Sequence, residues 1–170
     1  MTLDERGLTL AEVVAAAAII GIGLVGLMIV VPVSSYGLSE GNHLTTATFL
    51  AEERLEQVRN VPWTSSPDND CVGIGPTAAP TVPLTKICTH GTTTLAAGDV
   101  TFGDEPSVAS PYTQYARTVR ILDCAAGPCT GITSAGMRQI TVTISYRPLT
   151  PTGVATSSKS VMLTMLMAQR

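Results

Sequence analysis

The segment Gly7-Leu8-Thr9-Leu10-Ala11-Glu12, continued by the apolar run Val13–Val31, decides how this chain is organised. The run has 19 residues without a charged or strongly polar side chain. At about 1.5 Å per residue, a helix of that length spans roughly 28 Å, close to the thickness of the hydrocarbon core of a bilayer. We therefore expect a membrane-spanning helix segment over residues 8–33, with the bulk of the chain on one side of the membrane.

The flanks of this run indicate its orientation and its type. Arg6 precedes the run and no Lys or Arg follows it until Arg54, so the positive-inside rule places the N-terminus in the cytoplasm. A conventional secretory signal has a basic start, a shorter apolar region and a small-x-small cleavage site. Here the start contains two acids and one base, the run is longer, and Pro32-Val33 follows it. An uncleaved anchor is the simplest interpretation.

The quoted hexapeptide adds a feature that an ordinary anchor lacks. It resembles the type III signal of type IV pilins and pseudopilins, in which a short leader ends in Gly and is followed by an apolar residue, Thr, Leu, an aliphatic residue and Glu. The resemblance implies that residues 1–7 are a leader, that a prepilin peptidase cleaves after Gly7, and that Leu8 becomes the N-methylated first residue. It also implies a pilin-like fold.

Glu12 stands where a charge is costly. A carboxylate inside an apolar membrane helix costs about 2.5–3.5 kcal/mol on insertion scales, so it needs a partner. The resemblance implies that Glu12 neutralises the N-terminal amine of a neighbouring subunit and so fixes the axial register during assembly. The alternative interpretation is a Glu that caps the first helical turn, where the helix dipole favours an anion.

The run also contains the pattern G-x-G-x-x-G, at Gly21, Gly23 and Gly26. A dinucleotide site needs this pattern after a strand and within a βαβ unit. Here it lies within the expected membrane helix, where small residues let helices approach one another closely. We therefore expect no cofactor there.

Beyond the membrane segment, residues 34–62 are expected to continue the stalk as an amphipathic helix. Pro32 is expected to bend the chain, and residues 34–41 are weak helix formers where the helix is expected to loosen. From 44 to 60 an apolar stripe recurs at helical spacing, opposite a face of charged and amide side chains. The stripe consists of Leu44, Ala47, Leu50, Ala51, Leu55 and Val58, and the opposite face of Glu52, Glu53, Glu56, Gln57 and Arg59. The run F-L-A-E-E-R-L-E-Q-V-R resembles PilV-type minor pilins and minor pseudopilins of type II secretion.

Residues 63–170 are expected to form an extracytoplasmic, β-rich head. Its first part, 63–111, is rich in proline and loops, with a short strand compatible with Thr93–Phe102 and a turn at Asp68-Asn69-Asp70. The last third contains three alternating segments, at Ala116–Asp123, Met137–Arg147 and Lys159–Ala168. Turn residues and no crossover helix connect them, so we expect antiparallel pairing. The predicted fold class is α+β, a long N-terminal helix packed on a small antiparallel sheet.

Four cysteines, Cys71, Cys88, Cys124 and Cys129, all follow the apolar run. An even number in one region indicates two disulfides and an oxidising compartment. Of the three pairings, Cys71–Cys88 with Cys124–Cys129 closes the shortest loops, and Gly127-Pro128 turns the chain between the second pair. A zinc site is the alternative, but neither a C-x-x-C pair nor a histidine at ligand spacing favours it.

Charge and motifs argue against nucleic-acid binding and catalysis. The net charge of −3 provides no basic field for nucleic acid. His43 and His90 accompany no nucleophile motif and are interpreted as isolated surface residues, so the chain is expected to be neither an enzyme nor a cofactor-binding protein. The resemblance implies a minor pilin of a type IV pilus, with prepilin peptidase, other pilin subunits, an inner-membrane assembly platform and the lipid bilayer as partners. Before assembly it would lie in the bacterial inner membrane, and afterwards in the pilus, or in the periplasm or at the cell surface. A minor pseudopilin of a type II secretion system is the alternative, and a membrane-anchored periplasmic binding domain a more remote one.

Overall fold

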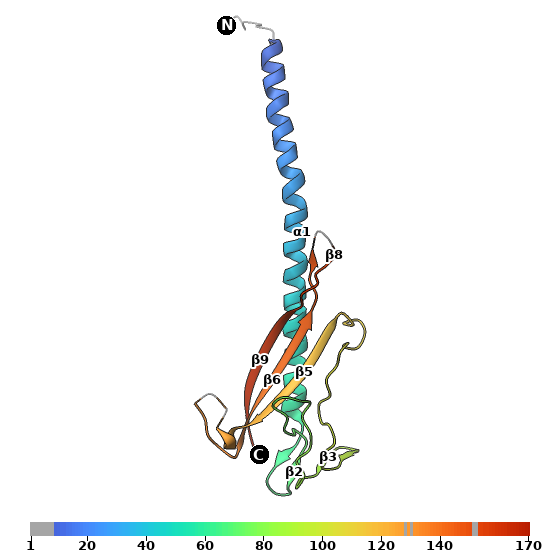
Figure 1. Ribbon diagram of the computed structural model, residues 1–170, viewed down its shortest axis with the longest axis vertical. Helices are drawn as coiled ribbons and strands as arrows, with labels where there is room; N and C mark the ends of the chain where they lie inside the picture. The colour runs from blue at the N-terminus through green and yellow to red at the C-terminus, as the bar shows by residue number, and fades with distance from the viewer. Residues whose placement is uncertain (1–8, 128, 130, 151–152) are drawn as a thin grey trace, which may run out of the picture.

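A computed structural model describes residues 9–127, 129, 131–150 and 153–170. One long helix, α1 (Leu10–Asn60), projects from a β-rich head, and the second half of α1 packs on the head (Figure 1). The head has small antiparallel sheets, the largest of three strands. The coarse expectation of an α+β chain with a long apolar N-terminal helix is thus confirmed. Residues 1–8, which include the expected leader and Leu8, lie outside the described part.

The helix is continuous through Pro32 and does not loosen over residues 34–41, which corrects the loosening expected there (Figure 1). Pro32 lacks the N–H that would bond to the carbonyl one turn earlier, but this is one bond in a helix of 51 residues. The weak helix formers that follow stay helical because the head holds this stretch: Glu40 accepts hydrogen bonds from Tyr146 and Lys159. Tertiary contacts here override local propensity.

The amphipathic half of α1 buries most of the expected stripe. Four of its residues are fully buried in the main core and a fifth, Leu55, is half-buried against it. The four are Ala47, Leu50, Ala51 and Val58. Leu44 is the exception, because 43% of it is exposed. The adjacent His43 instead faces the sheet at this level, so the buried stripe begins later than the sequence pattern predicts. The helix ends at Asn60, and Val61, which precedes Pro62, is extended.

The main sheet has the strand order β5-β6-β9, all antiparallel. Its strands are β5 (Tyr115–Asp123), β6 (Met137–Tyr146) and β9 (Lys159–Ala168). The three strands predicted from alternation therefore agree with the structure to within one residue at each end. Val142 pairs with Val119 on one side and Leu163 on the other, and the inner positions of β6 are buried against α1 while the outer ones are partly exposed. The alternation in Met137–Arg147 predicts that Ile140, Val142, Ile144 and Tyr146 share the inward face, and all four are buried.

The remaining elements are short. They are β1 (Trp63–Thr64), β2 (Asn69–Asp70), β3 (Cys88–His90), β4 (Thr93–Leu95), a 3-10 turn η1 (Cys124–Ala126), β7 (Leu149–Thr150) and β8 (Gly153–Val154). The strand expected within Thr93–Phe102 is β4, and it pairs with β3. The β1–β2 pair was not predicted, since two-residue strands have no periodicity to detect. Asp68 lies in a turn, as expected, whereas Asn69 and Asp70 belong to β2, which corrects the expectation for these two residues.

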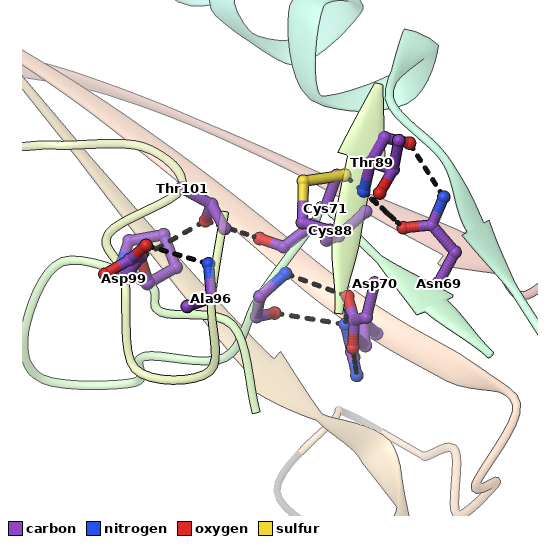
Figure 2. The surroundings of a disulfide bond; sticks show 12 residues. Asn69, Asp70, Cys71, Cys88, Thr89, Ala96, Asp99 and Thr101 are labelled. Carbon is purple, nitrogen blue, oxygen red and sulfur yellow. Dashed lines mark hydrogen bonds and ion pairs between the residues drawn. A yellow bond between two sulfur atoms is a disulfide. The ribbon is translucent and has the colours of Figure 1, made fainter. Parts of the chain in front are cut away.

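Both disulfides join the pairs preferred on loop length. Cys71 is bonded to Cys88, and Cys124 to Cys129. Figure 2 shows that the Cys71–Cys88 bridge links the end of β2 to β3. Beside it, the side chain of Asn69 accepts from the backbone N–H of Thr89 and donates to its carbonyl, at 2.9 and 2.8 Å. The bridge and these two bonds hold two parts of the loop-rich segment 63–111 against each other.

Candidate functional site on the first half of α1

The first turn of α1 is closed by a reciprocal cap between Thr9 and Glu12. The backbone N–H and the hydroxyl of Thr9 donate to Oε2 of Glu12 at 2.9 and 3.0 Å, and the N–H of Glu12 donates to the Thr9 hydroxyl at 3.3 Å. Such a capping box satisfies N–H groups that the helix itself leaves unpaired. The capping role, considered above as an alternative, is therefore present in the isolated chain.

The Glu12 carboxylate nevertheless keeps capacity for a second partner. Glu12 is exposed, and among the described residues its Oε1 accepts no hydrogen bond. A carboxylate has two oxygens and about four acceptor positions, so the cap uses only part of it. Gly7 and Leu8 lie outside the described residues, so cleavage after Gly7 and methylation of Leu8 stay predictions. The role of Glu12 in subunit register is also a prediction.

The apolar half of α1 is exposed along its whole described length. It contains a window with a mean hydropathy of 2.8, long and apolar enough to cross a membrane, and none of that window is buried. Leu10, Ile22 and Met28 are more than 75% exposed. A helix in the core of a soluble protein is covered by its own chain, whereas no described residue of the head covers this one. So large an apolar surface requires a cover from outside the described chain.

The glycines of the G-x-G-x-x-G run leave space on this surface. A methyl group added at Gly21, Gly23 or Gly26 would contact nothing within 4 Å. All three lie inside the first half of α1 and not in a strand-to-helix turn, so the geometry of a dinucleotide site is absent from this described segment. Small residues on a membrane-type helix are typical of close helix–helix packing. Here the described chain contains no helix to fill that role.

The stalk and the head are tied together where the exposed half of α1 gives way to the packed half. Oε1 of Glu40 accepts from Tyr146 and from Nζ of Lys159, each at 2.7 Å. Lys159 chiefly, and then Tyr146, hold the pKa of the Glu40 carboxyl below its usual range. Burial, reinforced by the bond to Glu40, raises the pKa of the Tyr146 hydroxyl well above its ordinary value.

His43 is part of this junction, which corrects its interpretation as an isolated surface residue. Its Nδ1 lies 2.8 Å from the Tyr115 hydroxyl, and its ring stacks on Tyr146 with centroids 5.4 Å apart. His90, at the end of β3, is exposed as expected. No local pattern predicted this aromatic cluster, because its members lie about 70 and 100 residues apart and only the fold brings them together.

A second polar group holds α1 to β5. Arg117 is almost fully buried on the inner face of β5, where it pairs with Glu105 at 2.8 Å and with Glu53 of α1 at 3.2 Å. Arg54 of α1 also pairs with Glu105. Alternation along β5 places position 117 inward with Val119 and Ile121, and this inward arginine was the available signal that a buried ion pair lies here.

The described part of the chain contains no candidate metal-binding site. Among residues 9–127, 129, 131–150 and 153–170, no group of three or more His, Cys, Asp or Glu side chains is placed to hold a metal ion. All four cysteines are used in disulfides. The zinc alternative therefore lacks its thiolate ligands.

Comparison with family models, with curated proteins and with solved structures gives no match to this chain.

Proposed function

We propose that this chain is a minor pilin, a structural subunit that a type IV pilus assembles through its N-terminal helix. The observation that carries the proposal is the apolar half of α1: it is wholly exposed, free of the head, and begins with a capped Glu12. A filament that buries such helices against one another removes this surface from lipid and from water alike. The hexapeptide Gly7–Glu12 supports the same proposal through its resemblance to the prepilin signal.

The chemistry at Glu12 fits this role. Cleavage after Gly7 would create a cationic amine on Leu8, four residues before the carboxylate. The Thr9 N–H, which donates to Glu12, is not removed by that cleavage, so the cap persists in the shortened chain. Oε1, which accepts no hydrogen bond from a described residue, is then available to the amine of a neighbouring subunit, and in an apolar surrounding this pairing offsets the cost of the charge.

Processing is tested by intact mass and N-terminal analysis of the chain co-expressed with a prepilin peptidase. We expect an N-methylated Leu8 in the wild type and the full-length chain in Gly7→Ala. A mature protein that keeps Met1, or that begins after Val31, would refute the proposal and leave an anchored or secreted β-domain.

Assembly is tested with Glu12→Gln, which keeps the shape of the side chain and removes its charge. We expect normal cleavage but loss of the subunit from sheared filaments. Glu52→Gln is the matched control, because Glu52 is exposed on the outer face of the packed half of α1. Recovery in a secretion-system pseudopilus, and not in a pilus, would assign the chain to the type II secretion alternative.

A further inference from the structure

We propose that the β7–β8 hairpin of the head contacts the phospholipid surface of the membrane in which α1 is anchored, with Leu149 and Val154 entering the interfacial layer and Arg147 facing the lipid phosphates. The inference rests on the membrane span that is part of the proposed function. It adds a second membrane contact on the head itself.

The direction of β6 brings this hairpin towards the apolar half of α1. The start of β6 lies near the end of α1, since Gln169 bonds to Gly136 and Arg170 bonds to Arg59 and Trp63. The end of β6 lies beside Glu40 through Tyr146. β6 therefore runs back along α1, and Figure 1 shows the hairpin that follows it alongside α1, at the end of the head nearest the N-terminal half.

The lengths match the membrane boundary. Glu40 lies seven residues after Val33, the end of the expected span, which is about 10 Å along a helix. The four residues from Arg147 to Thr150 cover about 13 Å when extended. The hairpin can therefore reach the level of Val33. The headgroup layer is roughly 5–7 Å thick on each side of the hydrocarbon core, so a hairpin that reaches the level of Val33 enters it.

The side chains of the hairpin suit this layer. Leu149 and Val154 are cross-strand partners, so both side chains stand on one face, and they are 50% and 61% exposed. The hairpin is held in shape by the bond from Ala155 N–H to the Pro148 carbonyl at 2.9 Å. Two apolar side chains side by side on a pair of bonded strands form a surface that water solvates poorly and that suits the interfacial layer.

Next to the Leu149–Val154 pair, Arg147 carries a positive charge. Arg147 is exposed, and within the described residues its side chain has no ion-pair partner. The chain contains no Asp or Glu after Asp123, and Glu40, the nearest acid on the stalk, is already paired with Lys159. An open groove of about 700 Å³, lined by Arg147, Leu149, Val154, Gln114 and Pro106, gives a phosphate access to the guanidinium. A planar guanidinium binds phosphate oxygens in pairs.

The test uses full-length protein in vesicles of phosphatidylglycerol and phosphatidylethanolamine, with brominated acyl chains that quench nearby tryptophan. The chain has one tryptophan, Trp63, which is buried near the end of α1 remote from the membrane segment and serves as background. Val154→Trp reports on the hairpin and Leu24→Trp on the span. Leu84→Trp is the control, because Leu84 is 86% exposed and precedes β3 at the opposite end of the head (Figure 1).

We expect strong quenching of Leu24→Trp and Val154→Trp and background quenching of Leu84→Trp. If Leu24→Trp is quenched but Val154→Trp matches Leu84→Trp, the hairpin contact is overturned while the anchor stands. If Leu24→Trp is not quenched, α1 does not span the membrane, and this refutes both the hairpin contact with lipid and the proposed function. Quenching of Val154→Trp reports the ratio of heads whose hairpin contacts the lipid to heads whose hairpin does not. Adding Arg147→Gln should lower this ratio about fivefold in anionic vesicles, because one cation near such a surface strengthens the contact by about that factor. An unchanged ratio would overturn the assignment of Arg147 to phosphate.

Discussion

Arg138 on β6 and Asp70 on β2 form a two-point ion pair inside the head. Nη1 of Arg138 lies 2.7 Å from Oδ1 of Asp70, and Nη2 lies 2.6 Å from Oδ2. The two side chains are only 5% and 1% exposed. The guanidinium also lies over the Trp63 ring, 4.3 Å from its centroid, and donates to the Gly73 carbonyl. This pair joins the loop-rich segment to the central strand of the main sheet.

Removal of Asp70 should therefore destabilise the head strongly. Asp70→Ala leaves a buried guanidinium without its counter-charge, and we expect a loss of about 3–5 kcal/mol in the free energy of unfolding. Urea unfolding in detergent micelles, followed by Trp63 fluorescence, measures it. Asp68→Ala is the control two residues away: its pair with Lys86 is 48% and 31% exposed and should contribute at most about 1 kcal/mol. Equal losses in the two variants would contradict the buried pair's role.

The two disulfides should differ in their contribution. Cys71–Cys88 spans 17 residues and Cys124–Cys129 spans 5, so the loop-closure model gives about 3 and about 2 kcal/mol respectively. Cys71 and Cys88 also belong to a buried cluster with Val82, so their loss should disturb packing as well. We expect a larger fall in stability for the paired replacement Cys71→Ala with Cys88→Ala than for Cys124→Ala with Cys129→Ala. The reverse order in urea titrations would show that the first loop is held by other contacts.

The junction at Glu40 should make stability depend on pH in the acid range. The folded pKa of Glu40 lies below its ordinary value of 4.5, because Lys159 and Tyr146 bind the charged form. Its contribution is therefore fully present above the unfolded pKa and is lost as the pH falls through the folded pKa. We expect Glu40→Gln to be less stable than wild type at neutral pH, and the difference to shrink below about pH 4. A difference that is the same at both pH values would show that the charge of Glu40 is not involved.

Sequence patterns predicted the long elements well and the non-local contacts poorly. The strands from Tyr115, Met137 and Lys159 were found because each alternates over nine or ten residues, which is enough for a period of two to be detected. The Asp70–Arg138 pair joins residues 68 apart, and no local pattern links them. The loosening expected over residues 34–41 was wrong because propensity takes no account of the contacts that the head makes with Glu40 and His43.

The sequence predicted the local features of the candidate site but not the contacts between distant segments. The exposed apolar helix and the cap at Glu12 follow from residues within a few positions of one another, so the sequence was sufficient. The hairpin beside the expected membrane boundary was missed, because its position depends on β6 running back along α1. The inward arginine on β5 was visible in the pattern, but its partners on α1 and in the loop were not.

Two leucines of the predicted stripe on α1 provide the sharpest test of how the stalk meets the head. Leu50 is 1% exposed and lies in the main core, whereas Leu44 is 43% exposed. Leu50→Ala should leave a cavity between α1 and the sheet and cost about 2–5 kcal/mol, while Leu44→Ala should cost about 0.5 kcal/mol or less. Because both variants make the same replacement in the same helix, the difference in helix propensity cancels. Comparable losses in urea unfolding would mean that the sheet covers Leu44 as well, and that the head packs on α1 one turn closer to its N-terminus.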